Sequence, residues 1–407
     1  MASICLALFI LELGARFFLA PPYHNRTAAH APLFNDQAND ILSCHNSLGW
    51  TGTPNFQGAV TLSDSNVELR FNTLGMHDTE HSLQKPPNSY RVLMLGDSYI
   101  HAIQVDEKYT AHQALENYLK QLDTAPDIQF EVISGGVTGW GTGQQLIYYR
   151  EQGRQFQPDL VLLMFFIGND FENNLPGHVL TIQEVNCYAP YFAWCDGQLY
   201  PDPLPYAPGV SGLRDNCSAT RRSLIKFMGF LYQHSRLYQQ LEPLIISNHP
   251  REIFGKGFSN SFWSLYLPQD EVALEQSWQV TQALFAQMKQ EVEADGARFG
   301  VVFFPWSVVI EFSVLSPEQQ SALLSQENPI FASVEANRPN RRLAGFLSAE
   351  NIPFIDLTES LMASYTTQDT PLYFVGDGHW TIEGNRFVAE ILADWLIAND
   401  LLPKAPR

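Results

Sequence analysis

Three short apolar runs, each followed at once by a glycine-containing motif, constrain the fold of this chain more than any other feature. Continuous apolar runs of this length are typical of strands that are buried on both faces of a parallel sheet. A motif that follows such a strand lies at the carboxyl edge of the sheet, where ligand sites form in folds of this kind. The runs and their motifs are residues 91–95 before GDS (96–98), 130–133, which Glu131 interrupts, before SGG (134–136), and 160–167 before GND (168–170).

Segments with one apolar face alternate with these runs, as expected for helices that cover a sheet. The helical segments and two further apolar runs are 111–122, 144–152, 274–292 and 382–398, with runs at 299–304 and 353–355. This alternation predicts an α/β fold with three αβα layers around a doubly wound, parallel, five-stranded, flavodoxin-like sheet. The three motifs should then meet at one edge of that sheet, although they lie far apart in the sequence.

Composition divides the chain into three parts. Residues 89–402 carry the alternating pattern, interrupted at about 172–269 by an insertion rich in proline, aromatic residues and cysteine. Residues 21–88 are rich in Asn, Pro, Gly and Ser, which predicts an irregular N-terminal extension packed on the main domain. Residues 1–20 form a hydrophobic segment that precedes both.

The hydrophobic segment 1–20 is expected to serve in export or in membrane anchoring. Its apolar run is interrupted by Glu12 and Arg16. The run is therefore short beside the roughly 20 apolar residues that span a bilayer. It also lacks the basic region that opens a secretory signal. A buried N-terminal helix is the alternative, and the cysteine content favours export.

Net charge limits the kinds of partner that the protein can bind, and cysteine content indicates its cellular compartment. The net charge of −19 argues against nucleic acid as a partner, because a phosphate backbone attracts a basic surface. Four of the five cysteines lie outside the N-terminal run. They predict two disulfides and an oxidising compartment, either the periplasm or the cell surface. The preferred pairs are Cys187 with Cys195 and Cys44 with Cys217, although four cysteines allow three pairings. Four thiols in a cytosolic protein are the alternative.

No metal is predicted, because no Cys-x-x-Cys pair or Cys/His cluster has the spacing of a zinc site. The glycine-dense segment 135–143 lets the backbone approach a substrate closely. It lacks the Gly-x-Gly-x-x-Gly order and the lysine of nucleotide-binding loops. No cofactor is therefore expected.

Ser98 and His379 are the candidate nucleophile and base. Ser98 follows the first apolar run at a strand-to-helix turn, and taken alone it would be interpreted as a helix N-cap. A serine hydroxyl becomes a nucleophile when a base lies beside it. His379 lies in a loop before the last helix. Asp377, two residues earlier, can hold the proton on its Nδ1 and leave Nε2 for the serine. We expect Ser98 Oγ and His379 Nε2 to lie roughly 2.6–3.2 Å apart.

Asn169, at the end of the third apolar run, is a candidate oxyanion donor. Its side-chain amide can donate to a negative charge that develops on a substrate oxygen. The alternative is a plain turn, since Asn and Gly both favour turns. The neighbouring Asp170 is expected to hold this loop, and His101, close to Ser98, is expected to pack rather than to catalyse.

These blocks resemble the SGNH/GDSL hydrolase family, which is named for a Ser, a Gly, an Asn and a His in four separated blocks. The resemblance implies that Ser98 is the nucleophile, His379 the base and Asn169 an oxyanion donor. It also implies that Gly139, with Gly136 as the second choice, supplies a backbone N–H to the oxyanion beside the N–H of Ser98. It extends over roughly residues 45–175 and 270–400, and the insertion has no counterpart in it.

The position of the acid departs from the common pattern of this family. Many members place the Asp three residues before the His, whereas residue 376 here is Gly and Asp377 lies two residues before. This Asp-x-His form resembles the branch that contains bacterial exopolysaccharide acetyl esterases and acetyltransferases. Further segments that resemble bacterial cell-envelope members are Glu12-Leu13 with Arg16, Leu48-Gly49-Trp50, and Asn72 to Gly75 followed by Asp78.

The resemblance implies acyl transfer from an ester to Ser98 and then to water. We therefore expect an exported carboxylic ester hydrolase that removes acetyl or other small acyl groups from a glycan. Two alternatives stay open: a carbohydrate O-acetyltransferase with the same machinery, and a non-catalytic carbohydrate-binding scaffold. Aromatic residues of the insertion either stack on sugar rings or form its own small core; they are Tyr188, Tyr191, Phe192 and Trp194.

Overall fold

The structure of the protein is a computed structural model, and it describes most of the chain. The described residues are 11–15, 40–62, 65–122, 127–182, 185–195, 197–206, 218–235, 237–238, 265–266, 272–327, 335–365 and 370–403. The predicted segment 1–20 therefore lies outside the described residues, apart from a helical turn at 11–15.

The centre of the molecule is a five-stranded parallel sheet with the strand order β13-β12-β7-β5-β6. The strands are β5 (Ser89–Gly96), β6 (Gln129–Gly136), β7 (Leu160–Phe166), β12 (Arg298–Phe304) and β13 (Phe354–Asp356). The predicted doubly wound, flavodoxin-like sheet is thus confirmed. Because β5 lies between β6 and β7, the winding reverses direction at β5, and a crevice forms beyond the carboxyl ends of such strands.

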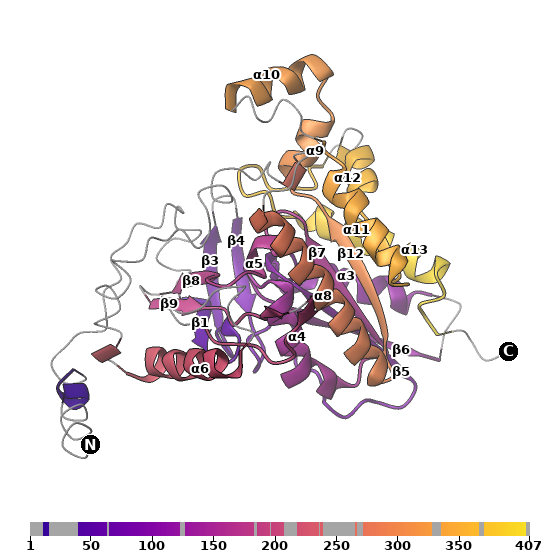
Figure 1. The fold of residues 1–407 in the computed structure, drawn as a ribbon. Helices are drawn as coiled ribbons and strands as arrows, with labels where there is room; N and C mark the ends of the chain where they lie inside the picture. The colour runs from indigo at the N-terminus through magenta and orange to yellow at the C-terminus, as the bar shows by residue number, and fades with distance from the viewer. Residues whose placement is uncertain are drawn as a thin grey trace.

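Helices cover both faces of the sheet and complete the three layers (Figure 1). Along β5 the side chains alternate, so that Leu93 and Leu95 enter one core while Val92 and Met94 enter the other. The first core lies under α4 (Thr142–Glu151), α8 (Val272–Ala294) and α11 (Arg338–Ala349). The second lies under α3 (Ala111–Lys120), α12 (Thr358–Tyr365) and α13 (Ile382–Ala398). A strand with apolar side chains on both faces requires such a double cover.

Short elements connect these layers. They are α2 (Ser98–His101), η2 (Glu107–Tyr109), η3 (Gly153–Phe156), α5 (Asp170–Asn173), α9 (Ser307–Ser313) and α10 (Pro317–Glu327). The helix α2 is a single turn that packs tightly against the ends of two strands. A Cβ added to Gly96 would lie 2.4 Å from Ile100 Cγ1, and one added to Gly136 would lie 2.5 Å from Ile100 Cβ. Glycine at these two strand ends lets α2 begin immediately after β5.

The N-terminal extension is more regular than its composition predicted. Over its described part it forms two antiparallel hairpins. The first joins β1 (Leu42–His45) to β2 (Gly49–Gly52), and the second joins β3 (Gln57–Leu62) to β4 (Ser65–Arg70). Trp50 of the first hairpin is fully buried in the core under α4 and α8. The extension is therefore part of the packed body of the protein.

The insertion contributes β8 (Val179–Ile182), β9 (Val185–Tyr188), β10 (Trp194–Cys195), β11 (Gln198–Leu199) and α6 (Ala219–His234). Tyr191 packs with Ala193, Leu204 and Ile225 in a small core, and Phe192 is buried in the main core. For these two aromatic residues the structure supports the interpretation as core rather than as a sugar platform.

The disulfide pairing differs from the preferred prediction. Cys44 of β1 is bonded to Cys187 of β9, with Cα atoms 5.4 Å apart. This bond excludes both preferred pairs, Cys187 with Cys195 and Cys44 with Cys217. Cys195 is also disulfide-bonded. The prediction failed because a bond across 143 residues depends on how the extension and the insertion meet, which sequence spacing does not encode.

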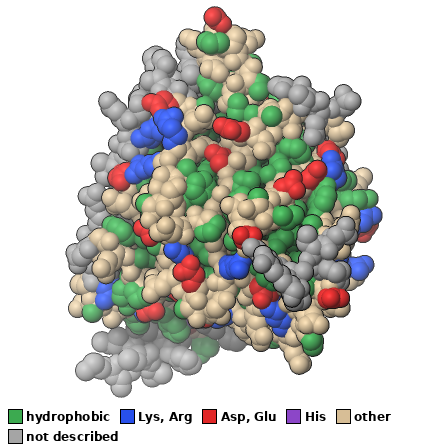
Figure 2. Space-filling model, turned by 90° about the vertical axis from the view of Figure 1, so that its right-hand side faces the viewer, with side chains coloured by type: hydrophobic (Ala, Val, Ile, Leu, Met, Phe, Trp, Pro, Cys, Tyr) green, Lys and Arg blue, Asp and Glu red, His purple; other side chains and the backbone are tan. Residues whose placement is uncertain are grey.

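The described helices and the surface charge bear on contacts with membranes and nucleic acids. Within the described ranges, every helix is too short or too polar to cross a membrane. On the face shown in Figure 2, the described Lys and Arg side chains are scattered among Asp and Glu side chains. This face therefore offers no continuous basic surface in its described part, which agrees with the strongly acidic net charge.

Candidate active site

Ser98 lies where the strand-helix motif predicted, at the first residue of α2 directly after β5. The cap of this helix is Asp97, whose Oδ1 accepts a hydrogen bond from the Tyr99 backbone N–H at 3.0 Å. The N-cap interpretation therefore applies to Asp97 and not to Ser98. The Ser98 hydroxyl is left to make a different contact.

That contact is with His379, from the loop before α13. Ser98 Oγ lies 2.8 Å from His379 Nε2, within the predicted range. His379 Nδ1 lies 2.5 Å from Asp377 Oδ1, which also accepts the His379 backbone N–H at 3.0 Å. The structure thus brings together a hydroxyl, an imidazole and a carboxylate, although Ser98 and His379 are 281 residues apart in the sequence. This is the arrangement in which an imidazole can take the proton of a serine.

Asp377 remains ionised in this arrangement. Burial by itself would raise its pKa, but the hydrogen bonds and the charge of His379 outweigh burial and hold the pKa below its ordinary value. A hydrogen bond from Gln104 acts in the same direction. An ionised Asp377 accepts the Nδ1 proton, which fixes the tautomer with an unprotonated Nε2 facing Ser98.

Tyr99 joins the two halves of this site, although no sequence pattern indicated this role. Its hydroxyl donates to the Gly378 carbonyl at 2.9 Å, and its ring centroid lies 4.8 Å from that of His379. Gly378 has a φ of +82°, and a Cβ there would lie 2.5 Å from Trp306 Nε1. The loop is therefore held from both sides. The available signal was only that Tyr99 directly follows Ser98.

Gly139 and Asn169 lie in the loops after β6 and β7, the two strands that flank β5. Gly139 has a φ of +77°, which favours glycine. Asn169 precedes α5, and its Oδ1 is buried without a hydrogen-bond partner. Among the described hydrogen bonds, neither residue is bonded to Ser98. Their role as oxyanion donors stays a prediction, placed at the correct edge of the sheet. Gly136, the second choice, ends β6 and lies against Ile100.

Two buried carboxyls lie at the same edge. Burial raises the pKa of Asp97 to about 6. Burial and the nearby charge of Asp97 raise the pKa of Asp170 well above its ordinary range. Asp170 Oδ2 accepts the Phe166 backbone N–H at 2.8 Å. Asp170 therefore holds the end of β7 and the loop that contains Asn169, and is not placed as a base.

His101 is fully buried on α2. Its Nδ1 lies 2.9 Å from Thr138 Oγ1 and accepts the Thr138 backbone N–H at 3.3 Å. Burial lowers its pKa well below the ordinary value, so the ring is neutral. His101 therefore packs against the turn that contains Gly139, in keeping with its predicted structural role.

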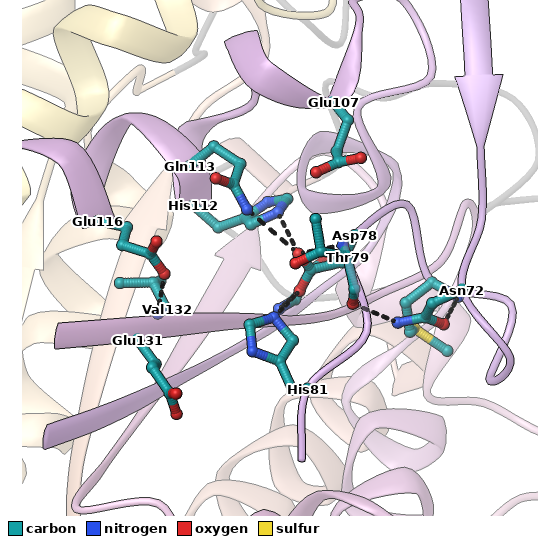
Figure 3. A network of polar contacts seen from close by, with 12 residues as sticks. Asn72, Asp78, Thr79, His81, Glu107, His112, Gln113, Glu116, Glu131 and Val132 are labelled. Carbon is teal, nitrogen blue, oxygen red and sulfur yellow. Dashed lines mark hydrogen bonds and ion pairs between the residues drawn. The ribbon is translucent and has the colours of Figure 1, made fainter. Parts of the chain in front are cut away.

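A buried carboxylate, Asp78, ties the extension to β6 and α3 (Figure 3). Its Oδ2 accepts from the Ser134 backbone N–H at 2.8 Å and lies 3.1 Å from His81 Nε2. Its Oδ1 lies 3.3 Å from His112 Nε2 and accepts from Gln113 at 3.2 Å. Burial alone would raise the pKa of Asp78, but the charges and hydrogen bonds of the two histidines hold it well below the ordinary range. The carboxylate is fully bonded and serves as a structural tie.

No cluster of His, Cys, Asp and Glu with the geometry of a metal site occurs in the described part of the chain. The candidate site is thus built from a hydroxyl, an imidazole, a carboxylate and two glycine- or asparagine-bearing loops. These groups define a class: an α/β protein with a serine–histidine–aspartate arrangement at the carboxyl edge of its sheet.

Comparison with known proteins adds little to this definition. No family model and no curated protein matches the chain. Among solved structures, the crystal structure of TesA is matched over 77% of this chain and 99% of that one, with 12% identity and a TM-score of 0.36. A lipase/acylhydrolase from Enterococcus faecalis is matched over 78% and 100%, with 11% identity and a TM-score of 0.36. A catalytic mutant of the acetylxylan esterase Axe2 from Geobacillus stearothermophilus is matched over 75% and 94%, with 10% identity and a TM-score of 0.37.

Proposed function

We propose that this protein is a serine-dependent carboxylic ester hydrolase of the SGNH/GDSL type. The observation that carries the proposal is the contact of Ser98 Oγ with His379 Nε2 at 2.8 Å, while Asp377 holds Nδ1 of the same ring at 2.5 Å. Ser98 is 7% exposed and begins α2 directly after β5, at the carboxyl edge of the sheet. The four blocks that resemble this family support the same assignment.

The reaction follows from these positions. Ser98 Oγ forms a bond to the ester carbonyl carbon while His379 Nε2 takes its proton. His379 then gives that proton to the departing alcohol as the ester C–O bond breaks. Water, activated by the same imidazole, attacks the acyl-enzyme and releases the acid. The negative oxygen of each tetrahedral intermediate would be held by the N–H groups of Ser98 and Gly139 and by the Asn169 amide.

We propose acetyl or another small acyl group on a glycan as the substrate class. Support comes from the spacing of Asp377-Gly378-His379, which resembles the branch of acetyl esterases and acetyltransferases that act on bacterial exopolysaccharides. Water is taken as the acceptor. The acetyltransferase alternative differs only in that a sugar hydroxyl replaces water.

The test is hydrolysis of p-nitrophenyl acetate and release of acetate from an acetylated glycan. Wild-type protein should turn over both, and Ser98→Ala should lose nearly all activity. Ser134→Ala is a matched control, because Ser134 is a buried serine on β6 whose Oγ has no hydrogen-bond partner. Equal activity in wild type and Ser98→Ala would refute the proposal. Added unacetylated glycan separates the acceptors, since a transferase would move the acetyl group onto it.

We also propose that the protein is exported and attached to a lipid surface at its N-terminus. The Cys44–Cys187 disulfide supports an oxidising compartment. On α6, Leu224, Phe227 and Phe230 are exposed together with the cation Lys226. An exposed apolar helix face that carries cations is typical of helices that lie in the interface of a bilayer.

The N-terminal turn lies at the end of this helix (Figure 1). Glu12 Oε2 accepts from Ser235 Oγ at 2.8 Å and from the Leu237 backbone N–H at 3.1 Å. Leu11 and Leu13 of the turn are exposed. The described turn 11–15 therefore lies at the end of α6, the helix that exposes Leu224, Phe227 and Phe230.

A further inference from the structure

Two side chains from outside the α/β domain hold successive carbonyls of the turn that contains Gly139. Trp50 Nε1 of the β1–β2 hairpin donates to the Thr138 carbonyl at 2.8 Å. His178, directly before β8, lies with its Nε2 2.6 Å from the Gly139 carbonyl, and Asn173 Nδ2 donates to the same oxygen at 3.3 Å. Because the acceptor is a carbonyl, His178 Nε2 carries the proton.

These contacts determine where the Gly139 N–H points. In a trans peptide the C=O and the N–H face opposite ways, and the peptide between Thr138 and Gly139 is trans. With the Thr138 oxygen directed to Trp50, the Gly139 N–H faces away from the indole. If this peptide flipped, a carbonyl oxygen would take the place of the N–H. A carbonyl would then repel the oxyanion that the N–H is expected to stabilise.

A disulfide joins the hairpins that supply the two donors. Cys44 is the cross-strand partner of Trp50 in the β1–β2 hairpin, and it is bonded to Cys187 of β9. Two residues after Cys187, the Ala189 N–H donates to the His178 carbonyl at 2.9 Å. The Trp50 and His178 rings consequently meet edge to face, with centroids 5.0 Å apart.

The hairpins also touch backbone to backbone. A Cβ added to Gly49, next to Trp50, would lie 2.7 Å from the Tyr188 carbonyl oxygen and 2.9 Å from Ala189 Cα. Trp50 itself is fully buried. A buried indole N–H without its acceptor, or a buried carbonyl without its donor, is costly. The pair therefore favours one orientation of the 138–139 peptide.

We propose that Trp50 and His178 are positioning residues that aim the Gly139 N–H at the oxyanion, and that the Cys44–Cys187 disulfide keeps them in place. The proposal rests on the proposed ester hydrolase function. It makes turnover depend on the redox state of a bond between the extension and the insertion, which does not touch Ser98. Neither side chain touches the reacting atoms.

The first test is Trp50→Phe, which removes the donor and keeps an aromatic ring. With p-nitrophenyl acetate, kcat should fall by about tenfold, less than the 10²–10³ of losing an oxyanion donor outright, while KM stays within about twofold. Trp395→Phe on α13 is the matched control, because it trims a buried tryptophan beside Gly300, away from the turn. Equal kcat in wild type and Trp50→Phe, or equal losses in both variants, would overturn the proposal.

The second test addresses His178 and the disulfide. His178→Leu should lower kcat, and His178→Gln, which keeps an N–H donor, should recover most of it. The Cys44→Ser/Cys187→Ser double variant, which leaves the disulfide of Cys195 in place, should show the kcat loss of Trp50→Phe while circular dichroism shows the protein folded. A folded double variant with full kcat would contradict the role of the disulfide.

The outcome for the proposed function is separate from these tests. If wild-type protein has no Ser98-dependent esterase activity, the hydrolase proposal itself fails before any variant is compared. If wild type is active and the Trp50 and His178 variants are equally active, the hydrolase proposal stands and only the positioning role is lost.

Discussion

The hydroxyl of Tyr99 offers a sharp test of how the site is held together. Tyr99→Phe removes one oxygen and keeps the ring, whose centroid lies 4.8 Å from His379 and 4.7 Å from Trp380. The lost oxygen donates to the Gly378 carbonyl at 2.9 Å in a buried setting. Removing one partner of a buried hydrogen bond costs about 1–3 kcal/mol, because the other partner is left unsatisfied. We expect the free energy of unfolding to fall by that amount.

Catalysis should respond as well, because Gly378 lies between Asp377 and His379. If about 1.4 kcal/mol of the lost energy is felt in the transition state, kcat falls about tenfold. Urea titration measures the stability change through the transition midpoint at constant slope, and ester hydrolysis measures kcat.

Tyr148→Phe is the matched control for this experiment. Tyr148 is buried on α4, and its hydroxyl has no hydrogen-bond partner. Removing that oxygen should therefore leave stability and kcat close to those of the wild type. If Tyr99→Phe and Tyr148→Phe behave alike, the tie between α2 and the His379 loop is not energetically significant, and the reasoning is refuted.

Three further predictions concern other parts of the molecule. Asp377→Asn should keep the fold but lower kcat by roughly 10⁴, as expected when the imidazole loses its orienting carboxylate. If kcat, measured across the pH range, is unchanged in this variant, another residue orients His379. Asp170 has a raised pKa in the folded state, so the folded protein binds its proton more tightly than the unfolded chain, and stability is lost as pH rises above the unfolded value. The Asp170→Asn variant should not show this loss of stability. The melting temperature of the variant minus that of the wild type should therefore increase from pH 4 to pH 8. A difference that stays constant over this range would contradict the raised pKa of Asp170. Phe227→Ser/Phe230→Ser should weaken flotation of the full chain with phosphatidylcholine vesicles, whereas Leu83→Ser, at an exposed residue of the extension, should not; equal flotation of the wild type and both variants would contradict a lipid contact by α6.

The sheet and the convergence of the motifs after β5, β6 and β7 were predictable from local patterns, whereas the meeting of Ser98 with His379 was implied by the resemblance to the SGNH/GDSL family. Most residues of the central strands are apolar, because both faces of the sheet are covered. The run at 91–95 therefore gave β5 (Ser89–Gly96), and the periodicity at 382–398 gave α13 with the same bounds. Parallel strands place their carboxyl ends at one edge, and so the motifs after β5, β6 and β7 had to converge.

The supports of the site were not predictable, because they depend on contacts between distant segments. The hydroxyl of Tyr99 reaches a carbonyl 279 residues away. The Cys44–Cys187 bond closes a separation of 143 residues between two short hairpins. Such short hairpins have too few residues for a clear hydrophobic periodicity. How they pack on the domain depends on the fit between surfaces that are far apart in the sequence. Trp50 likewise has the sequence signature of a core residue, and its donor role emerges only from the position of the Thr138 carbonyl.

The most direct test of the catalytic claim is covalent labelling of Ser98. A fluorophosphonate reacts with a serine that a neighbouring base activates, and peptide mass spectrometry locates the adduct. We predict a single adduct on the peptide that contains Ser98, absent in Ser98→Ala and strongly slowed in His379→Ala. An unlabelled wild-type protein, or labelling that is unaffected by removal of His379, would contradict the account.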